Sequence, residues 1–122
     1  MTVDSTSQNT LSATMAFHHD SPWFAGHFPD HPILPGIAQL SVVWDLICRS
    51  TKEKLCVKEF KRVKFRQIIH PQDQLEIQAV PSRTEPDTYS FTIKAKGETA
   101  CQGVITVRSK STIFTEGKKN EH

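Results

Sequence analysis

Residues 36–49 carry the only strong helix signal in this chain. After Gly36 the sequence reads I-A-Q-L-S-V-V-W-D-L-I-C-R, which is apolar almost all round. A helix with that pattern is buried on most of its faces. About 14 residues make a helix roughly 20 Å long, so the rest of the chain has to supply a surface that wraps around it.

The residues that follow this helix read as β-strands. Alternation of polar and apolar residues predicts four strands, over 58–69, 75–80, 89–95 and 100–107, with turns at 70–73, 81–88 and 96–99. A looser alternation over 11–18 predicts a strand before the helix. One helix combined with antiparallel strands is an α+β arrangement. The pattern therefore predicts an antiparallel sheet curved around one long central helix.

The length of 122 residues allows one domain. We expect it to span 11–108, with a flexible tail over 1–10 and a polar tail over 109–122, because both ends are rich in polar residues. A small domain built around one helix is expected to need a partner subunit to cover its remaining apolar surface.

Composition excludes several classes of function. The net charge of +2 is too small to indicate nucleic-acid binding. The three cysteines form no C-x-x-C pair, which predicts reduced thiols and a cytoplasmic protein. The N-terminus has no signal-peptide pattern, and no apolar run is long enough for a membrane span. We expect no cofactor.

A proline-rich loop over 21–35 precedes the helix. Loops of this length are usually functional or disordered, and the aromatic and apolar residues here argue against disorder. Pro29, Pro32 and Pro35 each fix φ near −65° and cannot donate a backbone hydrogen bond. The loop presents His27 beside the helix start, where free N–H groups can stabilise a developing oxyanion. This arrangement favours chemistry on a carbonyl.

Two stretches resemble a known family. G-H-F-P-D-H-P-I-L-P-G-I, residues 26–37, resembles the G-H-F-P-x-x-P-x-x-P-G-V signature of the FabA/FabZ β-hydroxyacyl-carrier-protein dehydratases. F-K-R-V-K-F-R-Q-I-I-H-P-Q-D-Q-L-E-I, residues 60–77, is similar to the family's F-x-x-x-V-x-P-G-D-x-L strand. The resemblance covers roughly residues 11–108 and implies a hot-dog fold, usually a dimer with the two sheets joined edge to edge. It also implies dehydration of a β-hydroxyacyl thioester, borne by acyl carrier protein, to a trans-2-enoyl thioester in fatty-acid or polyketide-type biosynthesis.

The resemblance assigns roles to individual residues. His27 would act as the base next to the α-carbon, and the backbone N–H of Gly36 would bind the thioester oxygen. The residues expected to line the substrate are Phe28, Ile33, Leu34, Pro35, Ile37 and Ser41.

The chain departs from the family at Ser41, where members carry Glu or Asp five residues after the signature glycine. A serine hydroxyl has no acidic proton to give at neutral pH. Asp45, one turn later on the same face, is the internal candidate, since a buried carboxyl with a raised pKa would suit an acid. The alternative for Asp45 is an ion pair with Arg49 at i+4, or a solvent-facing side chain.

A partner subunit is the other possible source of the acid. In the family, each active site takes its histidine from one chain and its carboxylate from the other. The loop is also similar to dehydratase-like proteins of aryl-polyene pigment clusters, which are thought to work in pairs. A homodimer or a heterodimer with another hot-dog subunit is therefore expected. The remaining alternatives are a catalytically incomplete subunit that binds acyl thioesters, and a hot-dog thioesterase.

Other polar residues receive simpler interpretations. The basic side chains over 61–66 indicate either a solvated edge strand or a docking surface for an acidic acyl carrier protein. His18 and His19 offer metal ligands, but no cysteine or carboxylate spacing completes a site, so we expect no metal. His31 is expected to be structural or solvent-facing, and Gln39 and Trp44 to be packing residues.

Overall fold

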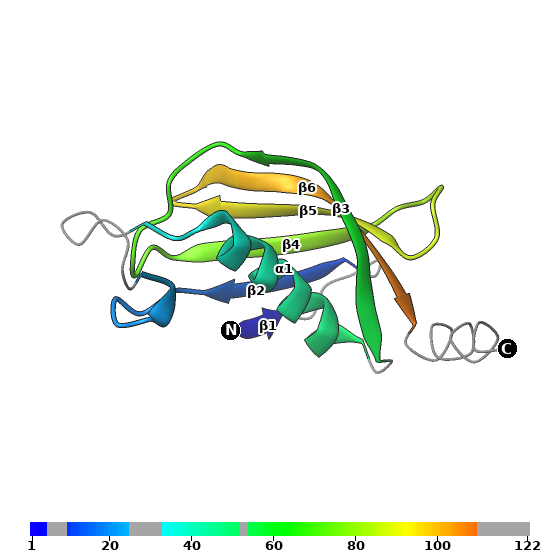
Figure 1. The fold of residues 1–122 in the computed structure, drawn as a ribbon, viewed down its shortest axis with the longest axis horizontal. Coiled ribbons are helices and arrows are strands. Elements are labelled where there is room, and N and C mark those ends of the chain that lie inside the picture. The colour runs from blue at the N-terminus through cyan, green and yellow to red at the C-terminus, as the bar shows by residue number, and fades with distance from the viewer. Residues whose placement is uncertain (5–9, 25–32, 52–53, 110–122) are drawn as a thin grey trace, which may run out of the picture.

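The computed structural model describes residues 1–4, 10–24, 33–51 and 54–109 of this chain (Figure 1). All structural statements below refer to these residues. The elements in chain order are β1 (Thr2–Asp4), β2 (Leu11–Met15), the short 3-10 helix η1 (Pro22–Phe24), α1 (Gly36–Ser50), β3 (Leu55–Phe65), β4 (Leu75–Pro81), β5 (Thr88–Ala95) and β6 (Glu98–Ser109).

The strands form one antiparallel sheet in the order β1-β2-β4-β5-β6-β3. Helix α1 crosses one face of this sheet, in front of β4 and β2 (Figure 1). The predicted α+β architecture with a single long helix is therefore confirmed.

The pattern of buried residues shows which face of the sheet and which face of α1 pack against each other. Strand β4 alternates strictly between buried and exposed side chains, the period-two pattern of a strand with one face on the core. The helix contributes its own stripe to that core, and its buried apolar residues are Ala38, Val42, Val43, Leu46 and Ile47.

The expectation that α1 is buried on most faces is wrong for the single chain. Ile37 is 64% exposed, and Leu40 and Trp44 are only partly buried. The reason is that one sheet covers one side of a helix, so the apolar residues on the other side have no cover within the described part of the chain.

The hairpin between β5 and β6 is confirmed, with a shorter turn than predicted. Lys96 and Gly97 have φ of +56° and +81°. A two-residue turn with positive φ at both positions matches the twist of the flanking strands. Strand β6 therefore begins at Glu98, inside the predicted turn.

Both predicted tails need correction where they are described. Val3 of β1 pairs with Ala13 of β2, so residues 2–4 belong to the sheet and are not a tail. At the other end β6 continues through Ser109. Residues 5–9 and 110–122 lie outside the described part of the chain.

Strand β3 runs over 55–65 and not over the predicted 58–69. It is an edge strand with register shifts, one of them between Lys61 and Lys64, and Arg62 within that shift has a φ of +57°. A bulge explains the shift, because an extra residue breaks the alternation used to place the strand. Charged side chains and a bulge are common protection for an exposed edge.

Candidate active site at the start of helix α1

The first turn of α1 leaves backbone donors open. Pro35 is the N-cap, with φ −62° and ψ 153°, and no side chain caps the helix. The Pro35 carbonyl accepts hydrogen bonds from Ala38 N–H at 3.1 Å and Gln39 N–H at 3.2 Å. The first N–H groups of a helix have no acceptor inside it. Gly36 and Ile37 therefore keep N–H groups without an acceptor among the described residues.

Leu34 fixes the approach to this helix. Its N–H donates to the Ile69 carbonyl at 2.8 Å, which ties the end of the loop to the segment between β3 and β4. The Leu34 side chain is 4% exposed and belongs to the hydrophobic core. Leu34 therefore packs in the core beside the helix start, and its expected contact with the acyl chain stays a prediction.

Phe65 lies directly against Gly36. A Cβ atom built on Gly36 would come within 2.8 Å of Phe65 Cζ, 3.1 Å of Cε1 and 3.2 Å of Cε2. A real side chain at residue 36 would overlap the ring, so the glycine permits the ring to lie on the helix start.

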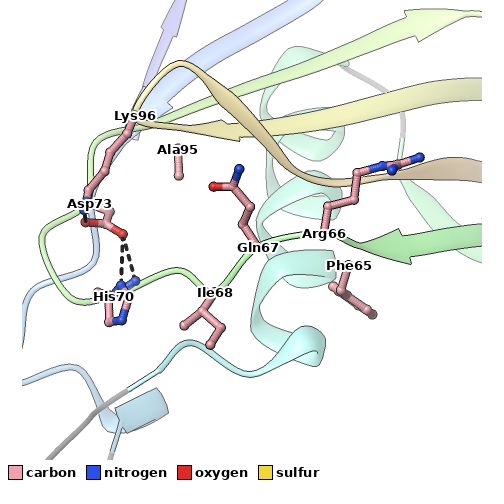
Figure 2. Close-up of a pocket in the computed structure, with 8 residues that line it drawn as sticks. All are labelled: Phe65, Arg66, Gln67, Ile68, His70, Asp73, Ala95 and Lys96. Atoms are coloured by element: carbon pink, nitrogen blue, oxygen red, sulfur yellow. Dashed lines mark hydrogen bonds and ion pairs between the residues drawn. The ribbon is translucent and has the colours of Figure 1, made fainter.

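A cavity of about 580 Å³ opens beside this corner (Figure 2). Most of its lining comes from the end of β3 and the segment leading to β4, and the rest comes from the β5–β6 hairpin. The Asp73 carboxylate lies between two basic side chains of the lining, with His70 Nδ1 and Lys96 Nζ each 3.7 Å from a carboxylate oxygen. The lining residues are Phe65, Arg66, Gln67, Ile68, His70, Asp73, Ala95 and Lys96.

Ser41 and Asp45 are already engaged within their own helix. The Ser41 hydroxyl donates to the Ala38 carbonyl at 2.8 Å. Both carboxylate oxygens of Asp45 accept from Arg49 Nε, at 3.0 and 3.1 Å, and the Asp45 side chain is 46% exposed. The idea of a buried Asp45 carboxyl is therefore wrong, and the alternative of an i,i+4 ion pair is confirmed.

Helix geometry also separates Asp45 from the open amides. Nine residues along an α-helix advance about 13.5 Å. Asp45 and the Gly36 N–H of the same chain are too far apart to act on neighbouring atoms of one thioester.

Two of the predicted site residues, His27 and Phe28, lie outside the described part of the chain, as does His31. Of the other predicted substrate contacts, Ile33 and Pro35 are partly buried and Ile37 is open. The structure thus brings Gly36, Ile37 and Pro35 together at one corner.

Gln39 is more than a simple packing residue. It is 4% exposed, and its Nε2 donates to the Leu34 carbonyl at 3.4 Å. Its Oε1 is buried with no hydrogen-bond partner among the described residues. The sequence offered a signal, since an amide within the first turn of a buried helix has to find partners there.

The Cys101 thiol is not an activated nucleophile. Burial raises the pKa of the Cys101 thiol to about 11. A thiol with a raised pKa is protonated and inert at neutral pH. No disulfide joins Cys48, Cys56 and Cys101.

A His-His-Asp cluster follows β2. Ligand atoms of His18, His19 and Asp20 lie within 4.8 Å of one another, and all three residues are exposed. Sequence spacing did not suggest that a carboxylate would join the two histidines. The Asp20 carboxylate lies 3.5 Å from His18 Nδ1 and 3.3 Å from His19 Nε2, and the Asp20 backbone N–H donates to His18 Nδ1 at 3.2 Å.

Solved structures with the same architecture establish the fold. The dehydratase heterocomplex ApeI:P from Xenorhabdus doucetiae matches with a TM-score of 0.76 and 24% identity, over 86% of this chain and 92% of the matched chain. A Streptococcus pneumoniae protein described as a hypothetical thioesterase with coenzyme A matches with a TM-score of 0.65 and 11% identity, over 86% of this chain and 81% of that one. The architecture is the hot-dog fold that the resemblance implied.

Sequence comparison gives the family. The family model for ApeI-like proteins, described as ApeI dehydratase, matches residues 3–104. The 3-hydroxyacyl-[acyl-carrier-protein] dehydratase FabZ of Rickettsia akari is 33% identical over 103 residues, which cover 75% of this chain and 70% of the relative. The FabZ of Rickettsia canadensis is 32% identical over 111 residues, covering 81% and 72%. The chain belongs to the ApeI-like dehydratase family, among the FabZ-related hot-dog proteins.

None of the helices in the described part of the chain has the length and hydrophobicity of a membrane span.

Proposed function

We propose that this protein is a hydro-lyase that converts a β-hydroxyacyl thioester into a trans-2-enoyl thioester. The reaction breaks the Cα–H and Cβ–O bonds, forms the Cα=Cβ double bond and releases water. The observation that carries the proposal is the pair of open amides at Gly36 and Ile37, placed directly after the histidine-containing loop in a member of a dehydratase family.

Two groups of this chain act in the enolisation: one removes the α-proton, and the other stabilises the thioester oxygen. The His27 imidazole acts as the base that removes the α-proton, a role for which histidine is the most common side chain. The Gly36 N–H donates to the thioester oxygen as negative charge develops there. A positioned base contributes roughly 10²–10⁴-fold, and an oxyanion donor contributes roughly 10²–10³-fold.

The acid that protonates the leaving hydroxyl comes from a partner subunit in this proposal. Within this chain, the Ser41 hydroxyl donates to a backbone carbonyl, and Asp45 pairs with Arg49 about 13.5 Å along the helix from Gly36. The uncovered face of α1 and the free edge of β3 are surfaces that a second hot-dog subunit could cover. The Xenorhabdus protein of the same fold is described as a heterocomplex, which supports a heterodimer over a homodimer.

The substrate is proposed to be carried by acyl carrier protein, as the names of the FabZ relatives state for those proteins. Arg62 and Lys64 line a groove of about 340 Å³ on the outer face of the sheet. Cationic side chains there would attract an acidic carrier protein. The reaction would belong to fatty-acid or polyketide-type synthesis in the cytoplasm, where three cysteines without a disulfide are expected.

The test is a product analysis with a β-hydroxyacyl carrier protein, with and without a second hot-dog subunit. Loss of water to give the enoyl thioester is the expected result, and His27→Ala should abolish it. Release of free carrier thiol without an enoyl product would show a thioesterase instead. Activity confined to the mixture would show that this subunit is incomplete on its own.

Ser41→Glu tests the origin of the acid. If a partner supplies the missing carboxylate, the second subunit should raise the rate of the wild-type chain by roughly 10²–10⁴-fold. Ser41→Glu should raise the rate of the chain alone and reduce its response to the partner. Full activity of the wild-type chain alone, lowered by Ser41→Glu, would place the acid within this chain.

A further inference from the structure

We propose that Phe65 determines which acyl groups this protein accepts, by forming a wall beside the amide that binds the thioester oxygen. This inference rests on the proposed function, since it takes the Gly36 N–H as the oxygen-binding group. Phe65 aligns with the first residue of the family's F-x-x-x-V-x-P-G-D-x-L strand, but the predicted site gives it no role.

The first argument is the position of the ring. Three carbons of the Phe65 ring lie within 2.8–3.2 Å of the place where a Gly36 Cβ would be. The ring therefore packs against the Gly36 Cα atom, which is one bond of about 1.46 Å from the amide nitrogen. A thioester oxygen on that N–H lies about 2.9 Å from the nitrogen. The carbons that follow the thioester carbonyl can therefore lie alongside the ring.

The second argument is exposure. Phe65 is 51% exposed, although it is a large aromatic residue at the end of a strand. Ile37, next to Gly36, is 64% exposed, and Ile68, which lines the same cavity as Phe65, is 59% exposed. Half of the exposed large apolar residues in the described chain thus gather around one helix start. Apolar surface gathered beside a polar anchor is typical of a small-molecule site.

The third argument is that the backbone under the ring is held in place. Arg66 N–H donates to the Ala100 carbonyl at 2.8 Å, and Gln67 N–H reaches the same oxygen at 3.3 Å. These bonds anchor the end of β3 to β6. Figure 2 shows the segment from Phe65 to His70 passing the N-terminal end of α1, with the Ile68 side chain pointing toward the chain that leads into the helix. A fixed backbone lets the ring discriminate between acyl groups by shape.

The lining of the cavity beyond the ring is polar. Gln67, His70, Asp73 and Lys96 follow Phe65 and Ile68 around it. An acyl group is therefore expected to stay on the side of Phe65 and Ile68, because apolar carbons gain nothing from the charged side. We therefore expect short or compact acyl groups to bind better than long ones.

The experiment compares two stable analogues, acyl pantetheine amides with a short and a long acyl chain, by calorimetric binding to the assembled protein. Phe65→Ala should change the ratio of the two affinities by about tenfold or more, and Phe65→Leu should change it less. Val80→Ala is the matched control, because Val80 is an exposed apolar residue on the other face of the sheet. The corresponding ratio of kcat/KM for β-hydroxyacyl substrates should move in parallel.

A double-mutant cycle tests the contact itself. Gly36→Ala keeps the N–H but pushes the Phe65 ring away, so it should reproduce the altered ratio of Phe65→Ala. The double variant Gly36→Ala/Phe65→Ala should then change the ratio no further than either single variant. Independent, multiplying effects would overturn the proposed contact.

The outcomes separate this inference from the proposed function. A binding ratio that moves in a protein without elimination activity would refute the reaction and keep the acyl wall. Elimination with an unchanged ratio in Phe65→Ala would refute the wall. A changed oligomeric mass in Phe65→Ala with an unchanged ratio would also refute it, and would make Phe65 a subunit contact.

Discussion

Replacing Gln39 by methionine should stabilise this protein. Gln39 is 4% exposed, and its Oε1 has no partner among the described residues. A buried acceptor without a hydrogen bond costs about 1–3 kcal/mol. Methionine has nearly the same shape and no polar atoms, and swaps that conserve volume are the best tolerated in a core.

The expected change in the free energy of unfolding is the cost of the unpaired Oε1 that the variant removes, less the worth of the hydrogen bond that it loses. The variant loses one hydrogen bond, from Gln39 Nε2 to the Leu34 carbonyl at 3.4 Å. At that length the bond is worth no more than about 0.5 kcal/mol, the lower end of the usual range. The free energy of unfolding should therefore rise by about 1 kcal/mol.

Urea denaturation of the full chain measures this change. With a slope of about 1–3 kcal/mol per molar urea, the midpoint should rise by roughly 0.3–1 M at unchanged slope. Gln78→Met is the matched control, since Gln78 is exposed on the outer face of β4 and should change little. A loss of 1 kcal/mol or more in Gln39→Met would mean that the buried oxygen has a partner, and would refute the reasoning.

Three further predictions follow from other parts of the molecule. Because the pKa of Cys101 is raised from 9.0 to about 11, the folded state holds the thiol proton up to a higher pH than the unfolded state does. The free energy of unfolding should be at its full value below pH 9 and fall by about 2–3 kcal/mol as the pH rises through 11. In denaturation measured across this pH range, Cys101→Ala should remove most of that loss. Asp45→Asn should leave the dehydration rate within about threefold and stability within about 0.5 kcal/mol, because the exposed pair with Arg49 contributes little; a hundredfold loss of rate would instead make Asp45 the acid. Arg62→Glu/Lys64→Glu should raise KM for the carrier-protein substrate at least tenfold at low salt and leave KM for the pantetheine thioester unchanged, whereas equal effects on both substrates would exclude carrier-protein docking.

The strongest periodic segments could be predicted from sequence. Helix α1 begins at the predicted Gly36 and ends one residue past Arg49, and β4 matches within a residue. These segments have an intact period of 3.6 or 2 over several residues. Strand β3 was misplaced because a bulge at Arg62 breaks its period. Strand β1 was missed because three polar-flanked residues carry no periodicity.

The site was predictable only where a motif identified it. The helix start at Gly36 follows from the glycine and the prolines before it. The contact between Gly36 and Phe65 joins residues 29 positions apart, so no local pattern could reveal it. The burial of Leu34 could not be predicted from the loop sequence, because it depends on the segment that Leu34 packs against, here the one around Ile69. Whether Asp45 was buried or paired with Arg49 could be decided only with a structure.

Hydration of an enoyl thioester in D₂O, the reverse reaction, tests the central claim most directly. The assembled wild-type protein should give a β-hydroxyacyl thioester carrying one deuterium on Cα, because the His27 imidazole returns a solvent-derived proton to that carbon. His27→Ala should lose the incorporation, while Val80→Ala should keep it. Deuterium uptake that is unchanged in His27→Ala, or cleavage of the thioester with no deuterium on carbon, would contradict the account.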